Sequence, residues 1–257
     1  MKFKKPVLIL VGIVIVLSAV CSVLGLTFGG NGNPREFLSI GGETIKIFGS
    51  GLYKNDSLSV VAQGKASDLV TLVFAIPLLM VSLVQSYQGS IKARLIMTGT
   101  LGYFLYTYMS YTFLWMYNPL FIVYVLLMSA SLFAFILAIL SFDNEKIPAL
   151  FSEKLPVRFL GGFQLFIAFA IGMLWLGKIA PTILNGTIPV GLEHYTTLVI
   201  QGMDLGFVVP AAVLSGILLI KRKPLGYLLS SVIIIKGITM LTCISAMIIN
   251  SYLSGIE

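Results

Sequence analysis

Charged side chains are scarce in this chain of 257 residues: Asp, Glu, Lys and Arg make up 11% of it, whereas 58% of the residues are hydrophobic. Soluble domains carry about 25% charged residues, because polar groups have to cover a surface in water. The composition therefore argues against a soluble enzyme, a nucleic-acid-binding domain and a disordered chain. It predicts an all-α membrane protein whose partner is the lipid bilayer, with no nucleic-acid partner.

Histidine and cysteine are nearly absent as well. The chain has one histidine, His194, and two cysteines, Cys21 and Cys243, both within apolar runs. A zinc site needs several Cys or His ligands, and a disulfide framework needs a larger set of cysteines. The motifs of hydrolases, metalloproteases and nucleotide-binding folds are also missing from the sequence. We therefore expect no metal, no cofactor and no catalytic residue, and an enzyme is the less favoured interpretation.

Long apolar runs dominate what is present. A helix needs roughly 20 mostly apolar residues to cross a bilayer, and seven runs reach that length. They cover residues 6–28, 68–88, 95–117, 119–142, 159–179, 197–220 and 224–250. Asn118-Pro119 and the segment 221–224 are turn signals that pair neighbouring runs as antiparallel hairpins. The sequence thus predicts a single polytopic domain over residues 1–257, with seven transmembrane helices.

The distribution of lysine and arginine predicts the orientation. With a cytoplasmic N-terminus, eleven of these residues fall on the inner side and five on the outer side, which agrees with the positive-inside rule. The first run follows three lysines, as in a signal peptide, but it exceeds the length of about 7–15 residues typical of a signal-peptide core. We expect it to be an uncleaved span, which places the C-terminus outside the cell.

Residues 29–67 form the longest segment between predicted spans. Two β-prone runs flank Gly41-Gly42, a pattern typical of a β-hairpin. Thr44 and Lys46 alternate with Ile45 and Ile47, so one face of the hairpin is able to lie against the helices. We expect a small extracytoplasmic β-hairpin cap. On the inner side, the mixed charged and apolar residues 143–158 predict a short interfacial helix.

Two ionisable residues lie within predicted spans, where each costs at least about 2.5–3.5 kcal/mol at the centre of the bilayer. Lys236 lies near the middle of the seventh run and Asp204 in the outer half of the sixth. Counted from the connecting turn, their depths differ by roughly 6 Å at 1.5 Å per residue, a gap that a lysine side chain is able to bridge. We expect an Asp204–Lys236 pair that either locks two helices together or acts as a ligand counter-ion, a substrate carboxylate site or a proton relay. The remaining alternative is that the two side chains do not meet.

Glycine and proline surround this aspartate. Gly202 and Gly206 are spaced for close helix approach, and Pro210 removes a helical hydrogen bond, as Pro77 does in the second run. Interrupted helices occur in membranes where protein or a water-filled cavity satisfies the freed backbone groups. Both a tightly packed kink and a polar cavity fit the pattern.

The third run carries a polar stripe that is poorly suited to lipid. Its members are Gly99, Tyr103, Tyr106, Thr107 and Ser110. We expect this face to point into the bundle, where its tyrosines pack between helices. The alternatives are that they form hydrogen bonds with Gln164 or Asp204, or that they cover an amphipathic ligand. Asp68 opens the second run and is interpreted as the cap of that helix.

These patterns converge on a candidate ligand pocket within the membrane. Its predicted residues are Tyr103, Tyr106, Gln164, Gln201, Asp204 and Lys236. We expect it to bind or transport a small or lipid-like molecule. The alternative is a non-catalytic accessory or sensory protein that acts through the outer loop.

Several segments carry a resemblance to a known group of proteins. They are residues 51–57, 68–72, 77–79, 89–90, 102–108 and 117–121. They resemble a group of bacterial multi-spanning membrane proteins with no assigned activity, which implies a bacterial plasma membrane. The mid-span Lys236 and the β-structured outer loop also resemble heliorhodopsins. A retinal Schiff base needs a carboxylate counter-ion, however, and the third run contains no Asp or Glu.

Overall fold

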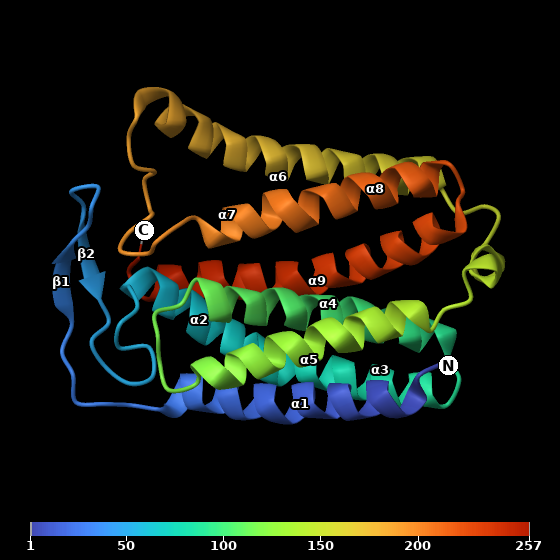
Figure 1. The fold of residues 1–257 in the computed structure, drawn as a ribbon, viewed down its shortest axis with the longest axis horizontal. Coiled ribbons are helices and arrows are strands. Elements are labelled where there is room, and N and C mark those ends of the chain that lie inside the picture. Colours follow the sequence, from blue (N-terminus) through green and yellow to red (C-terminus); the bar gives the residue numbers. More distant parts are fainter. Residues whose placement is uncertain (1, 257) are drawn as a thin grey trace.

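The computed structural model describes residues 2–256 as an elongated bundle of helices that run along its long axis, with loops at both ends (Figure 1). The continuous long helices are α1 (Lys4–Thr27), α4 (Ile91–Phe113), α5 (Phe121–Leu140), α6 (Val157–Asn185) and α9 (Pro224–Leu253). Two further passes are interrupted: α2 (Leu58–Val70) continues into α3 (Ile76–Tyr87), and α7 (Val199–Met203) into α8 (Val209–Ile220). The turns predicted at Asn118-Pro119 and at 221–224 are confirmed.

Each interruption is a π-helical segment that lies just before a proline. Thr71–Ala75 joins α2 to α3, and Asp204–Val208 joins α7 to α8. Pro77 and Pro210 are the second residues of the helices that follow. Because proline has no N–H to donate, the preceding turn loses a regular hydrogen bond and widens. The predicted interruption of these two helices is confirmed.

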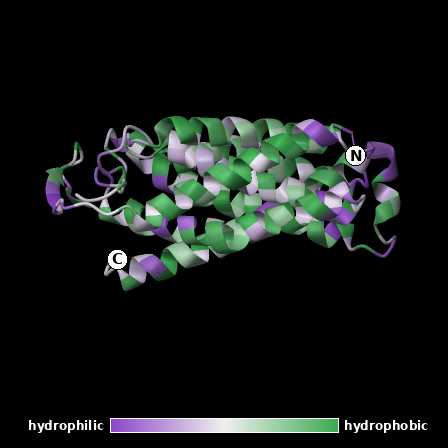
Figure 2. Cartoon of the chain, turned by 90° about the horizontal axis from the view of Figure 1, so that it is seen from below, coloured by the Kyte–Doolittle hydropathy of each residue, from purple (hydrophilic) through white to green (hydrophobic). Residues whose placement is uncertain are grey.

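Six helical passes are long and apolar enough to cross a membrane: α1, α2–α3, α5, α6, α7–α8 and α9. The chain is therefore a multi-pass membrane protein. Hydrophobic residues follow the helices, and hydrophilic ones gather toward the ends (Figure 2). The predicted third span corresponds to α4, which has the length but is not among these six. It packs against α3, α5 and α9 in the interior of the bundle.

The predicted start of the second helix and the predicted interfacial helix are wrong. The second helix begins at Leu58, ten residues before the predicted start, and it is capped by Ser57, whose side-chain oxygen accepts a hydrogen bond from the Val60 N–H. Asp68 therefore lies inside a helix and does not cap one. The inner segment 143–158 contains two short 3-10 turns, Asn144–Lys146 and Pro148–Leu150, in place of an interfacial helix. Pro148 separates them because it cannot continue a hydrogen-bonded turn.

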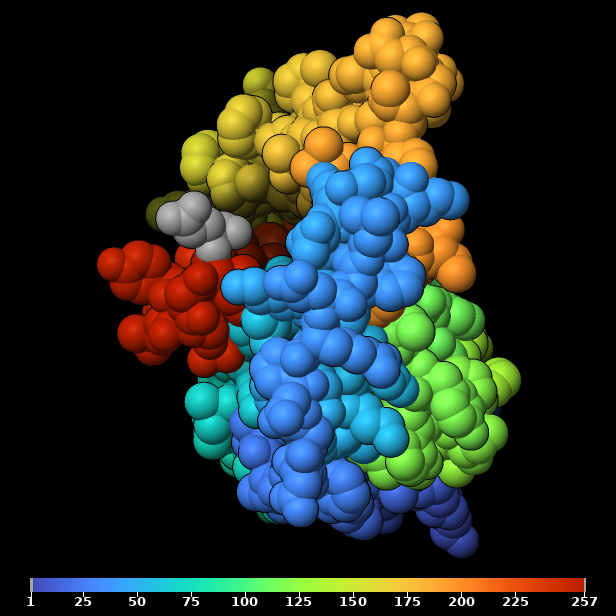
Figure 3. Space-filling view, turned by 90° about the vertical axis from the view of Figure 1, so that its left-hand side faces the viewer, coloured from blue at the N-terminus to red at the C-terminus, as the bar shows by residue number. Residues whose placement is uncertain are grey.

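The predicted hairpin is confirmed. Strand β1 (Arg35–Leu38) pairs antiparallel with β2 (Thr44–Ile47), and Gly42 takes a positive φ of 81° in the turn between them. Ile45 and Ile47 are buried, whereas the alternating Thr44 and Lys46 are exposed. Figure 3 looks onto this end of the bundle, where the segment that follows α1 lies across the helix ends and reaches the segment that follows α6. The hairpin thus forms a cap at one end of the bundle.

Helix α6 lies at the edge of the bundle and packs mainly against α8 (Figure 1). The two backbones approach closely at Gly161 and Gly216. A Cβ atom on Gly161 would lie 2.7 Å from the Gly216 carbonyl oxygen, and one on Gly216 would lie 2.8 Å from the Gly161 carbonyl oxygen. Small residues at such crossings are the usual means of packing helices in membranes.

Candidate functional site

Tyr106 of α4 contacts polar side chains from other helical segments, and together they form a group of four. The Tyr106 hydroxyl donates to Asp204 Oδ1 at 2.8 Å. The indole N–H of Trp175, on α6, donates to Asp204 Oδ2, also at 2.8 Å. The Lys236 ammonium, on α9, lies 4.2 Å from the centre of the Tyr106 ring. We call Tyr106, Trp175, Asp204 and Lys236 the Tyr106 cluster.

The direct Asp204–Lys236 ion pair that we predicted is not formed. Among residues 2–256, the only oppositely charged groups within 4 Å of each other are Lys146 and Asp143. Tyr106 contacts both Asp204 and Lys236, with its hydroxyl and its ring face respectively. The two charges are thus connected through an aromatic ring. The predicted hydrogen bond between a tyrosine of this face and Asp204 is confirmed.

The other predicted pocket residues lie elsewhere in the packing. Tyr103 is fully buried, and its hydroxyl is 2.8 Å from that of Thr71 in the first π-helical segment. Gln164 is hydrogen-bonded to Ser215 between α6 and α8. Gln201 is half-buried on α7, one turn before Asp204. The structure therefore groups Tyr106, Asp204 and Lys236 and places Tyr103 and Gln164 in separate polar contacts.

The second π-helical segment begins at Asp204, and no other part of the protein packs closely against the glycines on either side of this residue. Gly202 and Gly206 are exposed, and a Cβ atom on either would have no neighbour within 4 Å. The close helix approach that we predicted for this pair is therefore wrong. Asp204 and Lys236 are themselves only half-buried. The Tyr106 cluster thus remains reachable from the outer surface of the bundle.

A second polar cluster was missed by the sequence analysis and centres on Asp68. This carboxylate is 2% exposed. Its Oδ2 accepts a hydrogen bond from the Tyr53 hydroxyl at 2.6 Å, and its Oδ1 accepts one from the Tyr111 hydroxyl at 3.0 Å. Tyr53 precedes α2, whereas Tyr111 lies near the end of α4. We call these three residues the Asp68 cluster.

The residues around the Asp68 cluster fit it closely. A Cβ atom on Gly25 of α1 would collide with the Asp68 carboxylate and the Tyr53 hydroxyl, so only glycine leaves room for this hydrogen bond. The Trp115 ring lies tilted against both tyrosines, with its centre 4.4 Å from that of the Tyr53 ring and 4.5 Å from that of the Tyr111 ring. A buried carboxylate enclosed by donors and aromatic rings is a packing element that joins α1, α2 and α4.

A third buried acid, Asp56, joins the segments at the capped end of the bundle. Its Oδ1 accepts hydrogen bonds from the Met116 backbone N–H at 2.9 Å and from the Tyr195 hydroxyl at 3.1 Å. The neighbouring His194 ring nitrogen Nε2 lies 2.9 Å from the Asn55 carbonyl oxygen. Asp56 thus ties the cap to the turn between α4 and α5 and to the segment that follows α6.

Burial raises the pKa of Asp56 from its ordinary value of 3.8 to about 7. The hydrogen bonds from Met116 and Tyr195 lower this pKa, and the negative charge of Glu193 raises it again. The second carboxylate oxygen, Oδ2, is buried and has no hydrogen-bond partner. Desolvation therefore outweighs the two hydrogen bonds, and in the folded state the neutral form is favoured below about pH 7.

Comparison with family models, with curated proteins and with solved structures gives no match to this chain. Within residues 2–256, no three His, Cys, Asp or Glu side chains are grouped so that they would hold a metal ion. The function therefore has to be inferred from the three polar clusters and from the surface.

Replacing Tyr53 with Phe tests the Asp68 cluster. We expect Tyr53→Phe to lower the free energy of unfolding by about 1.5–3 kcal/mol, because a buried carboxylate loses one of its two donors. Thermal or denaturant unfolding in detergent measures this change. Tyr117→Phe is the matched control, since Tyr117 is 76% exposed and should be neutral. Equal stability of the two variants would contradict the role assigned to this hydrogen bond.

The raised pKa of Asp56 predicts a pH dependence. Between about pH 4 and pH 7 the folded state holds a proton that the unfolded state releases, so stability falls as the pH rises through this range. We expect the unfolding temperature to be lower at pH 8 than at pH 5, and we expect Asp56→Asn to weaken this dependence. The difference between the two proteins isolates Asp56 from other titrating groups. An identical pH profile in the variant would show that Asp56 does not contribute.

Proposed function

We propose that this protein lies in a bacterial plasma membrane, crosses it seven times and binds a small amphipathic molecule at the Tyr106 cluster. The protein would either bind this molecule alone or bind and transport it. The seventh crossing is α4, which is enclosed by helices that are apolar enough to span. The excess of lysine and arginine at one end supports a cytoplasmic N-terminus and an extracytoplasmic C-terminus.

The observation that supports ligand binding is that the Lys236 ammonium has no anionic partner among residues 2–256. Both oxygens of Asp204 accept hydrogen bonds, from Tyr106 and from Trp175, and neither lies within ion-pair distance of the lysine. Within residues 2–256, the Lys236 ammonium has a ring face beside it but no hydrogen-bond acceptor. An ammonium group away from water is costly unless it is paired. A ligand with an anionic or strongly accepting head would provide that pairing.

The surroundings favour a ligand that is partly apolar. The cluster lies within the helical part of the bundle, next to the exposed Phe207 on the second π-helical segment. A carboxylate or phosphate head would meet Lys236, and the indole of Trp175 and the ring of Tyr106 would cover an adjoining apolar part. A fatty acid is the simplest molecule with this chemistry, and it provides a practical probe.

Photo-crosslinking with a diazirine-bearing fatty acid tests this function. We expect label on α4, α7–α8 or α9 of the purified protein, and we expect Lys236→Met to reduce it about tenfold, since a hydrogen bond to a charged group contributes about 1.5–3 kcal/mol. Lys92→Met is the matched control, because Lys92 is exposed at the start of α4. Equal labelling of the wild type and Lys236→Met, with both folded, would refute the proposal.

The cap provides a specific reason to keep the second function, an accessory or sensory role through the outer loop. Phe37, Leu38 and Ile40 of the hairpin region are 47%, 68% and 80% exposed. Apolar side chains gathered outside the helical part indicate a surface for another protein. Such a partner would bury them, and Asp56 would connect that surface to the bundle.

A photo-reactive residue at Ile40 tests the second function in intact cells. If the cap has a protein partner, we expect one discrete cross-linked species from position 40 that is absent from position 92, because Lys92 is exposed at the start of α4 and is not part of the hairpin. The cross-links are read by gel mobility and identified by mass spectrometry. Recovery of lipid alone, or identical products from both positions, would argue against a role through the cap.

A further inference from the structure

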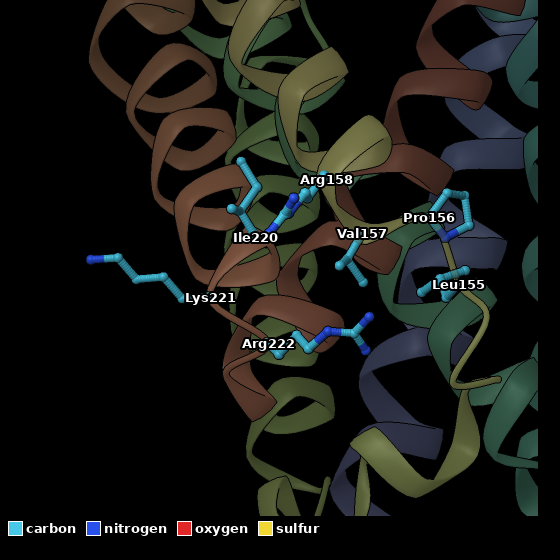
Figure 4. A pocket seen from close by; sticks show the side chains of 7 residues that line it. All are labelled: Leu155, Pro156, Val157, Arg158, Ile220, Lys221 and Arg222. Carbon is cyan, nitrogen blue, oxygen red and sulfur yellow. The ribbon is translucent and has the colours of Figure 1, made fainter.

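A hollow of about 500 Å³ opens at the end of the bundle opposite the cap, between the start of α6 and the turn from α8 to α9 (Figure 4). Its walls are formed by Leu155, Pro156, Val157, Arg158, Ile220, Lys221 and Arg222. Three of these residues are cationic and none is acidic. The Arg222 side chain extends beneath Val157, whereas Lys221 points away from the other side chains.

The backbone holds the two arginines on either side of the hollow. A Cβ atom on Gly161 would lie 2.6 Å from Ile220 Cγ1, so the first turns of α6 rest directly against the end of α8. After Ile220 the chain turns sharply, because the Lys223 N–H donates to the Leu218 carbonyl oxygen at 2.9 Å. Arg222 takes a positive φ of 52° in this turn. Arg158 and Arg222 thus line one hollow from two different helix ends.

The charge of this hollow favours an anionic ligand. Within residues 2–256, neither arginine is paired with a carboxylate, because the one ion pair is Lys146–Asp143. Guanidinium groups bind phosphate with two parallel hydrogen bonds, which a compact ammonium cannot do. The lining of the hollow therefore contains two such groups.

An apolar surface continues from the hollow along α6. Phe159, Phe163 and Phe166 are 70%, 52% and 63% exposed, and their spacing places them on one face of the helix. The rings of Phe159 and Phe163 are stacked, with centres 6.4 Å apart. A ligand that fits both features has an anionic head and a long apolar tail.

We propose that this hollow binds an anionic phospholipid. Its phosphate lies between Arg158 and Arg222, and one acyl chain follows the phenylalanine face of α6. This site is separate from the Tyr106 cluster, and it stands on the membrane location of the chain alone. It would anchor α6, which packs mainly against α8, to the lipid of one leaflet.

Native mass spectrometry of the full chain in detergent, with added phosphatidylglycerol or phosphatidylethanolamine, tests the proposal. We expect one tightly held phosphatidylglycerol. We expect Arg158→Gln/Arg222→Gln to weaken its binding by about 30-fold, since each basic residue near an anionic lipid contributes about 1 kcal/mol and 1.4 kcal/mol is a factor of ten. The matched control is Lys5→Gln/Lys92→Gln, which removes two exposed charges from the same end of the bundle and should retain the lipid.

Four outcomes would overturn the proposal. Equal losses of phosphatidylglycerol binding in the two double variants would show that the lipid is held by general attraction between charges and not at a specific site. Displacement of the lipid by inorganic phosphate, or unchanged binding in Phe159→Ser/Phe163→Ser, would assign the hollow to free phosphate. If the arginine variant does not fold, protection of residues 155–158 and 220–222 from covalent labelling is measured in the wild type. Absence of protection by phosphatidylglycerol would also refute the site.

Discussion

Helix α4 carries more hydroxyl groups than a lipid-facing helix is able to expose, and the other helices are arranged around that constraint. The hydrocarbon core offers no water to a tyrosine or threonine hydroxyl, so each one needs a partner within the protein. Thr98, Thr100 and Thr112 donate to carbonyl groups one turn earlier in α4 itself. Tyrosine side chains are too long for this: Tyr106 and Tyr111 donate to Asp204 and Asp68, and the Tyr103 hydroxyl is hydrogen-bonded to Thr71. These bonds fix the positions of the segments that carry the partners.

Two aspartates accept these tyrosine hydrogen bonds. Their surroundings differ, and we assign a packing role to Asp68 and a proposed binding role to Asp204. Asp68 is enclosed, and both of its oxygens accept hydrogen bonds from tyrosine hydroxyls. Asp204 is half-buried, and the tyrosine that it holds lies face-on to Lys236. In the first case every polar group is satisfied and rigid packing follows. In the second case the Lys236 ammonium has no hydrogen-bond acceptor among residues 2–256, and a ligand would complete the arrangement.

Much of the fold could be predicted from the sequence, because its signals are local. Apolar length, the turn residues at Asn118-Pro119 and the alternation in β2 each depend on a few neighbouring residues. The interrupted helices were predictable from Pro77 and Pro210. The position of Asp68 was not, because a polar start to an apolar run looks like a cap when the helix in fact continues upstream through polar residues. Its tyrosine partners are 15 and 43 residues away.

The candidate site was only partly predictable for a related reason. Depth along two helices was enough to bring Asp204 and Lys236 to a similar level, but rotation about the helix axes decides which side chains meet. That rotation is set by packing, and it places Tyr106 in contact with both charges. In the same way, Arg158 and Arg222 line one hollow because Gly161 has no side chain and α6 and α8 therefore come into direct contact. No spacing along the chain indicates that contact.

We propose that α4 crosses the bilayer surrounded by apolar helices. Together with the six apolar passes, this gives seven crossings, an odd number. Reporter fusions at the two ends of the chain test it most directly, with one reporter active only in the cytoplasm and one active only outside. Our account predicts a cytoplasmic signal from the N-terminal fusion and an external signal from the C-terminal fusion. Signals from the same side of the membrane at both ends would contradict it.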